Sequence, residues 1–438
     1  MRLSHVVTCS LLLLAACGQP HAGRPADAAP PGAAGSSASE GAGANGSPAP
    51  IATVADLAAA EASAQSSIDA LRAGDFKGAA EQAAQVIERE PNNPQAHLVS
   101  AIASYRRVMH QQWLDVRTVL FGGLEAGGFN HRYMRSSLTE TEAELAKVEH
   151  SLAIAAAHRG VSLELCLACW EIDWNHNGRI DNRDRLVFQI EQDQNGRPIP
   201  EGDPRRKPTF RFDDGDVAWA RAFVSFQRAA LSVVLAYDWD ALDLVLARLD
   251  RGKAPDKLVI RLKHPERVAQ ARRLILTGLG HADQCRRDYL AETDDDREWV
   301  PNPRQRHHPL PLPVDQRLYD TWEGVIGDLT RLVRGEEGLS VAALAQLGDH
   351  QWKNPPRGYL DFGAMLSQPK DIVLRPKELE RLVEARQVET ALKSVLGTYY
   401  VRQMKPSPIL SRLSRMKGEM ERGEESLERK LRYLLWLN

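Results

Sequence analysis

The stretch from Asp173 to Asp184 places oxygen-bearing groups at nearly every second position around a single glycine. Gly178 stands at the sixth position, where a sharp turn favours a residue that tolerates positive φ. The oxygen donors are the side chains of Asp173, Asn175, Asn177, Asp181 and Asp184, with the backbone carbonyl of Arg179. Hard divalent cations bind through such oxygens. The stretch therefore predicts a loop that curls around a cation and brings its flanking segments together.

This spacing resembles the calcium-binding loop of EF-hand proteins, in which alternate positions and the last position supply the ligands. The last position differs, because Asp184 stands where EF-hands usually carry a bidentate Glu. In this respect the loop is also similar to the calcium repeats of dockerin modules. The resemblance implies a Ca²⁺ site that a helix over residues 162–172 enters. The alternative is a turn rich in Asn, Asp and Gly that connects two helices without an ion.

The start of the chain has the pattern of a secretory signal peptide over residues 1–16, because a short basic beginning precedes an apolar run. This run is too short to span a membrane. The tetrapeptide from Leu14 to Cys17 resembles the lipobox of bacterial lipoproteins. The resemblance implies a lipid anchor on Cys17, with palmitate among its acyl chains, and a place in the bacterial cell envelope. Gly18 after the cysteine implies the outer membrane if the host is Gram-negative.

Residues 17–50 combine the anchor with Ala, Gly, Pro and Ser and carry few charges, a composition typical of a disordered tether. The body over residues 51–438 is expected to be globular, since 43% of the chain is hydrophobic and 26% is charged. The formal charge of the chain is -2. Near-neutrality argues against a general nucleic-acid binder, which needs a basic surface.

Apolar residues recur at helical spacing through most of the body, which predicts an all-α fold. We expect a helical-repeat-like bundle with one EF-hand-like helix-loop-helix. Three regions are predicted: a tetratricopeptide-like helical segment over 51–160, the loop and central helices over 161–300, and a C-terminal helical region over 301–438. Within the last region, the pattern predicts an amphipathic helix from Asp315 to Arg334 that ends at Gly335.

The segment after residue 51 resembles one tetratricopeptide repeat in its small residues and turns. The matching residues are Gly74, Asp75, Phe76, Ala79, Ala80 and Pro91 to Pro94. One repeat is too short for a solenoid, which needs about three to bury a continuous core. We therefore expect a helical hairpin docked on the rest of the chain, or alternatively a groove that binds a protein partner.

Besides Cys17, the exported part of the chain contains Cys166, Cys169 and Cys285. Cys166 and Cys169 form a C-x-x-C pair that could bridge, or be redox-active, in an oxidising compartment. The apolar residues around the pair favour the simpler interpretation of buried structural thiols in a helix.

Three acidic residues, Asp213, Asp214 and Asp216, precede an apolar stretch from Val217 to Tyr237 that we expect to form a buried central helix. Acidic residues at a helix start stabilise it through capping and the helix dipole, and this is the simplest role for them. Alternatively, one of them completes the calcium sphere, or a pair of them forms an acid/base site.

The sequence contains no G-x-S-x-G, H-E-x-x-H or Gly-Lys-Ser/Thr motif, so an enzyme would depend on dispersed acids alone. The combined features favour a lipid-anchored helical scaffold for interaction or assembly at the cell envelope. Such a scaffold would hold Ca²⁺ in a structural loop and bind an unidentified protein partner. An exported hydrolase with an acidic site near Asp213 to Asp216 is the alternative.

Overall fold

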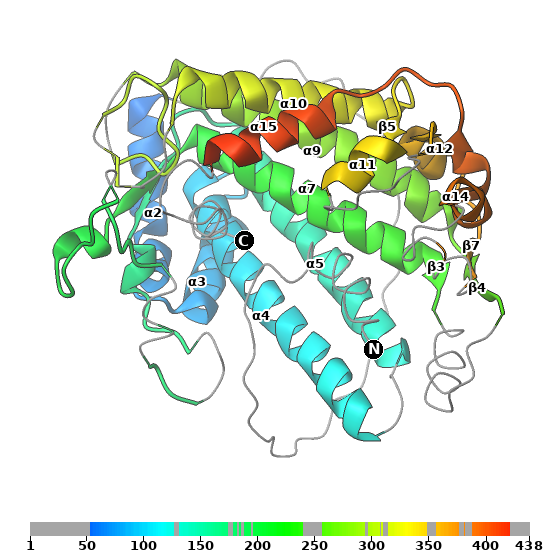
Figure 1. The fold of residues 1–438 in the computed structure, drawn as a ribbon. Coiled ribbons are helices and arrows are strands. Elements are labelled where there is room, and N and C mark those ends of the chain that lie inside the picture. The colour runs from blue at the N-terminus through cyan, green and yellow to red at the C-terminus, as the bar shows by residue number, and fades with distance from the viewer. Residues whose placement is uncertain are drawn as a thin grey trace.

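The computed structural model describes residues 53–126, 131–173, 178–181, 184, 188–193, 196–239, 256–293, 297–306, 308–309, 314–347, 356–375, 381 and 388–420. Within these residues the protein is built mainly from α-helices, with three small antiparallel sheets beside them (Figure 1). The predicted all-α bundle is therefore confirmed. No helix in the described part is long and apolar enough to cross a bilayer. The predicted signal peptide and Cys17 lie outside the described residues.

The chain enters the bundle through a helical hairpin, α2 (Val54–Arg72) and α3 (Phe76–Arg89). Gly74 makes the turn possible because its φ of 79° is rarely adopted by other residues. Asp75 then caps α3, since its Oδ1 accepts a hydrogen bond from the Gly78 amide at 2.8 Å. Both helices pack on α4 (Pro94–Ala126), so the hairpin docks on the rest of the chain as expected.

The body is a series of helices in which each packs on the next. It runs from α4 through α5 (His131–Ala156), α7 (Asp214–Ala236) and α9 (Pro265–Ala291) to α10 (Gln316–Arg334). Helix α7 crosses the middle of the molecule, with α5 against it on one side and α9 on the other (Figure 1). Of its residues only Ala230 is exposed, and the others are buried or half-buried. The prediction of a buried central helix is therefore confirmed.

The predicted helix over residues 162–172 is wrong. Residues Leu163–Leu165 form strand β1, which pairs antiparallel with β2 (Phe210–Phe212), and Leu167–Cys169 form the 3-10 turn η1. The physical reason is the pairing with β2, which buries the two leucines of β1 and leaves Glu164 between them half-buried. A period of two fits a strand and not a helix. The segment that precedes the predicted calcium loop is thus a strand followed by a turn.

Short elements outside this series complete the fold, and among them α12 (Phe362–Ser367) packs on both α9 and α10, whereas α15 (Ile409–Met420) packs on α10. Two further sheets have the orders β3–β4–β7 and β5–β6–β8. Their strands are β3 (Tyr237–Asp238), β4 (Leu258–Leu262), β5 (Leu339–Ser340), β6 (Tyr359–Leu360), β7 (Ile372–Leu374) and β8 (Tyr400–Val401). The remaining helical elements are η2 (Pro204–Arg206), α11 (Val341–Leu347), α14 (Val388–Leu396) and η3 (Gly397–Tyr399).

Trp170 connects the N-terminal hairpin to the segment before the predicted calcium loop. Its Nε1 donates a hydrogen bond to the Leu71 carbonyl at 2.9 Å, and its ring packs edge-on against Phe76 and Phe188. A Cβ at Gly74 would lie 3.3 Å from this ring, so the turn of the hairpin fits closely against it. These contacts belong to the largest hydrophobic cluster of the protein. The loop therefore starts from a rigid part of the core.

Candidate functional site

The described residues of the predicted calcium loop are tied together by two local hydrogen bonds. The Gly178 amide donates to Oδ2 of Asp173 at 2.7 Å, and the Asp181 amide donates to Oδ2 of Asp184 at 2.9 Å. Gly178 has the positive φ of 82° that its position in the loop predicts. The chain therefore curls back on both of its terminal carboxylates. Asn175 and Asn177 lie outside the described residues.

The loop contains both buried and accessible potential ligands. Asp184, the last of them, is 3% exposed, so its carboxylate is held inside the protein although it is shorter than the usual Glu. Asp173, at the start of the loop, is half-buried, and Arg179 is exposed. A buried carboxylate needs hydrogen-bond donors or a cation to replace its hydration. The amide of Asp181 supplies one such donor.

A second group of acidic side chains meets where α7 begins and α9 ends. Asp213 is the N-cap of α7, Glu292 is the C-cap of α9, and Glu298 follows on the segment that bridges to Arg211 in β2. One oxygen from each of the three carboxylates lies within 4.8 Å of the other two. This is a spacing at which they could hold a metal ion. Glu292 and Glu298 could not be predicted from the sequence, because no local pattern indicates that the chain returns to Asp213 after about eighty residues.

Helix capping at α7 is confirmed. Oδ1 of Asp213 accepts a hydrogen bond from the Gly215 amide at 3.1 Å, and Oδ2 of Asp216 accepts one from the Asp213 amide at 3.0 Å. The two aspartates thus form a reciprocal capping box. Asp214 has a different task, since it accepts a hydrogen bond from the Gly160 amide and pairs with Arg159 at 3.4 Å.

The crowding of these acids shifts their titration. Burial and then the charge of Asp213 raise the pKa of Asp216 to about 8. Burial, followed by the charges of Asp213 and Glu298, raises the pKa of Glu292 to about 10. In both residues the neutral form is favoured because an ionised carboxylate would lose water and face other negative charges. At neutral pH, bound protons on Asp216 and Glu292 therefore reduce the repulsion among these carboxylates. A bound cation would reduce the same repulsion.

Asp213 is held in this acidic group and not in the predicted calcium loop. The pairing of β1 with β2 sets Phe212 opposite Leu163, so Asp213 follows at the end of the ribbon where β1 begins. The loop leaves from the other end, after Leu165. Asp213 is grouped with Glu292 and Glu298, which come from the α9 end of the bundle. The two acidic sites are thus built from different segments.

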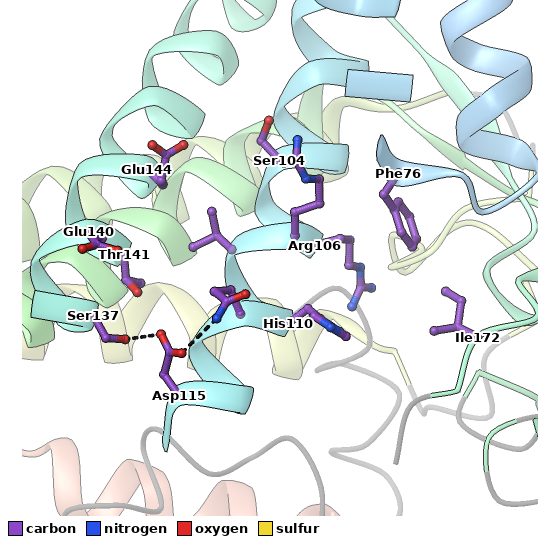
Figure 2. Close-up of a pocket in the computed structure, with 13 residues that line it drawn as sticks. Phe76, Ser104, Arg106, His110, Asp115, Ser137, Glu140, Thr141, Glu144 and Ile172 are labelled. Carbon is purple, nitrogen blue, oxygen red and sulfur yellow. Dashed lines mark hydrogen bonds between the residues drawn. The ribbon is translucent and has the colours of Figure 1, made fainter. Parts of the chain in front are cut away.

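A groove with a volume of about 460 Å³ lies between α4 and α5 (Figure 2). Helix α4 contributes basic side chains that include Arg106, Arg107 and His110, whereas α5 contributes Glu140 and Glu144. The Arg106 guanidinium also lies over the rings of Trp170 and Phe188, at 5.6 and 5.3 Å from their centres. The two walls of the groove therefore differ in charge, and one end of it adjoins the core that supports the loop.

Asp115 lines the groove and accepts several hydrogen bonds from both helices. Its carboxylate accepts hydrogen bonds from Ser137 at 2.5 Å, Tyr133 at 2.7 Å and Gln111 at 2.9 Å. The hydrogen bond to Asp115 raises the pKa of Tyr133 to about 12. This carboxylate holds α4 and α5 together across the groove (Figure 2).

The C-x-x-C pair is a disulfide, Cys166–Cys169, on the turn η1. Cys169 is exposed and Cys166 is half-buried, so the prediction of buried structural thiols is wrong for this pair. The reason is the missing helix, since the turn after β1 directs the second cysteine outward. Cys285 is a free, fully buried thiol.

Comparisons of this chain with protein-family models, with curated proteins and with solved structures find no match.

Proposed function

We propose that this chain is a helical interaction scaffold, lipid-anchored in the bacterial cell envelope, whose loop over residues 173–184 holds a structural Ca²⁺. The observation that carries the calcium site is the hydrogen bond from the Gly178 amide to Asp173, formed at a positive φ. This bond closes the first half of the loop. The bond from the Asp181 amide to Asp184 closes the second half.

Calcium would replace water at a loop that is already curled. Its binding to the folded chain alone would stabilise that chain by RT ln(1 + [Ca²⁺]/Kd), about 2.7 kcal/mol at a hundredfold excess over Kd. Because extracellular calcium is high enough to fill even weak loops, the ion would be a constant part of the fold. It would tie the core around Trp170 to the segment that continues to Phe188.

The scaffold role is supported by the groove between α4 and α5. This groove adjoins a tetratricopeptide-like hairpin and has walls of opposite charge, which suits a protein segment that carries both charges. The proposed lipid anchor on Cys17 and the tether over residues 17–50 would hold this surface away from the membrane. The partner is a protein that the sequence does not identify.

The test is thermal unfolding of the chain from residue 18 onward, with calcium and with a chelator. We expect calcium to raise Tm, and Asp173→Ala to abolish that rise. Asp193→Ala is the matched control, because Asp193 also accepts a backbone hydrogen bond, from Arg197 at 2.9 Å, but lies outside the loop. The control should change Tm equally with and without calcium. An unchanged Tm on calcium addition to the unsubstituted chain would reject the calcium site.

The second candidate is an exported hydrolase that uses the acidic group of Asp213, Glu292 and Glu298. Its specific support is the spacing of three carboxylates from separate segments, one with a pKa high enough to act as an acid. Glu298→Gln is the informative variant, because Glu298 takes no part in the capping box. Loss of hydrolysis of ester or glycoside substrates at an unchanged Tm would favour the enzyme. If the protein is a scaffold, neither the unsubstituted chain nor the Glu298→Gln variant should hydrolyse these substrates.

A further inference from the structure

The Cys166–Cys169 disulfide lies at the protein surface, on a turn that is itself well anchored. Cys169 is exposed, whereas Leu167 and Ala168 between the two cysteines are buried. Trp170 directly after the pair is fixed in the core by its hydrogen bond to the Leu71 carbonyl. An external thiol can therefore reach one sulfur of the disulfide without any opening of the core.

The turn does not depend on the disulfide for its shape. The Cys169 amide donates to the Cys166 carbonyl at 3.0 Å, and the Trp170 amide donates to the Leu167 carbonyl at 3.3 Å. A disulfide that closes so short a loop also removes the least entropy from the unfolded chain. Buried neighbours and backbone hydrogen bonds thus hold the segment. The bond between the sulfurs can open while the fold persists.

The surroundings of Cys166 are suited to the reduced state. Its Sγ lies 3.6 Å from the carbonyl oxygen of Lys207, in the range of a hydrogen bond that involves sulfur. Only the thiol can donate such a bond, since a sulfur in a disulfide carries no proton. The carbonyl therefore stabilises the reduced form over the disulfide and makes the disulfide easier to reduce.

We propose that Cys166–Cys169 is a thiol–disulfide exchange site whose substrate is an accessible dithiol. A thiolate of the substrate attacks Sγ of Cys169, the bond between the two sulfurs breaks, and Cys166 leaves as a thiolate that takes up a proton. The second thiol of the substrate then attacks the substrate sulfur of this mixed disulfide and releases Cys169. Two electrons and two protons pass to the protein, and the substrate becomes a disulfide.

The remaining described cysteine cannot take part in this exchange. Cys285 is fully buried in the bundle, and burial raises the pKa of its thiol well above the ordinary value. A buried neutral thiol is neither accessible nor nucleophilic. The substrate must therefore come from outside, and Cys166 is the residue that resolves the mixed disulfide when the reaction runs in reverse.

The first experiment places the chain from residue 18 onward in buffers with increasing ratios of reduced to oxidised glutathione. Free thiols are trapped in the folded chain with excess alkylating reagent at neutral pH, and the labels are then counted by mass. We expect Cys166 and Cys169 to be alkylated together while circular dichroism reports an intact fold and Cys285 stays unlabelled. Structural disulfides resist the glutathione couple. If the pair stayed oxidised until denaturant unfolded the chain, the proposal would be overturned.

The second experiment identifies the attacked sulfur with two matched single variants. Cys166→Ser leaves the exposed Cys169, and Cys169→Ser leaves the half-buried Cys166. We expect Cys166→Ser to form a mixed disulfide with oxidised glutathione at least about tenfold faster, because exchange rates follow the access of the sulfur. Equal rates, or the reverse order, would contradict attack at Cys169. Equal Tm values of the two variants would establish that both are folded.

Discussion

The hydroxyl of Tyr289 lies 2.6 Å from Oδ1 of Asp216, and this hydrogen bond joins the last turn of α9 to the first turn of α7. Both residues are almost fully buried. A Cβ at Gly215 would lie 2.5 Å from the Tyr289 ring, so the two helix ends can meet only because this position is glycine. The contact fixes the geometry that brings Glu292, at the end of α9, towards Asp213 at the start of α7.

The first prediction concerns the pH dependence of stability. The pKa values of Asp216 and Glu292 are raised in the folded chain to about 8 and about 10, from ordinary values of 3.8 and 4.5. The folded chain therefore binds more protons than the unfolded chain between those values. The stabilisation is fully present below the ordinary values and is lost as pH rises through about 8 and then about 10.

Glu292→Gln keeps the shape of the side chain and removes its ionisation. We expect its Tm to fall less steeply than that of the unsubstituted chain between about pH 6 and 9. Glu81→Gln is the control, since Glu81 is an exposed side chain on α3 and should leave the slope unchanged. Identical slopes for the Glu292 variant and the unsubstituted chain would show that this carboxyl titrates normally.

The second prediction compares two glycines that have equal space around them. A Cβ at Gly178 or at Gly280 would meet no atom of the described residues within 4 Å, but only Gly178 has a positive φ. We expect Gly178→Ala to destabilise the chain by about 1–2 kcal/mol, from backbone strain alone. Gly280→Ala, within α9, should stabilise it by about 0.5–1 kcal/mol. Urea unfolding in the presence of a chelator measures the change in unfolding free energy of both variants. If both changes had the same sign, positive φ at Gly178 would not be the cause.

The third prediction concerns the attachment of α15. Asp328 on α10 is completely buried, and it pairs with Arg331 and, through Oδ2 at 2.8 Å, with Nε of Arg412 on α15. Gly324 leaves the space for Arg412, because a Cβ at position 324 would lie 2.5 Å from the Arg412 guanidinium. The ion pair and the close approach together determine where α15 packs.

Asp328→Ala should destabilise the chain by about 2–3 kcal/mol. The value lies below that of a fully buried pair, because the two arginines left behind are about a third exposed and can be hydrated. Limited proteolysis should then cleave the segment of α15 faster. Lys77→Ala, which removes an exposed ion pair with Glu81, should change stability by less than about 1 kcal/mol. An equal effect of both variants would mean that Asp328 contributes no more than a surface charge.

Several local structures could be predicted from the sequence because neighbouring residues determine them. Helix α10 begins after Asp315, whose Oδ1 accepts the Leu318 amide at 3.0 Å, and it ends at Gly335 with a φ of 80°. The capping box of Asp213 and Asp216 is equally local, since its partners are three residues apart. The turn at Gly178 is local as well, because the positive φ at this position favours glycine.

The segment from Leu163 to Cys169 depended on contacts that the sequence does not display. Its apolar residues fit a helix and a strand equally well over so short a length. The pairing of Leu163 with Phe212 decided for the strand, and the turn that follows placed Cys169 at the surface. The exposed disulfide is a consequence of that pairing.

The sequence by itself determined the helical class, the start of α7, the start and end of α10, and the order of oxygen donors from Asp173 to Asp184. Each of these depends on residues within about one or two turns of each other. Only the tertiary structure brought Glu292 and Glu298 to Asp213, because the packing of α7 on α9 closes sequence separations of 79 and 85 residues. Caps, turns and ligand spacing depend on neighbouring residues, so the sequence displays them directly. The meeting of distant carboxylates depends on how the buried faces of the helices pack, which no local pattern displays.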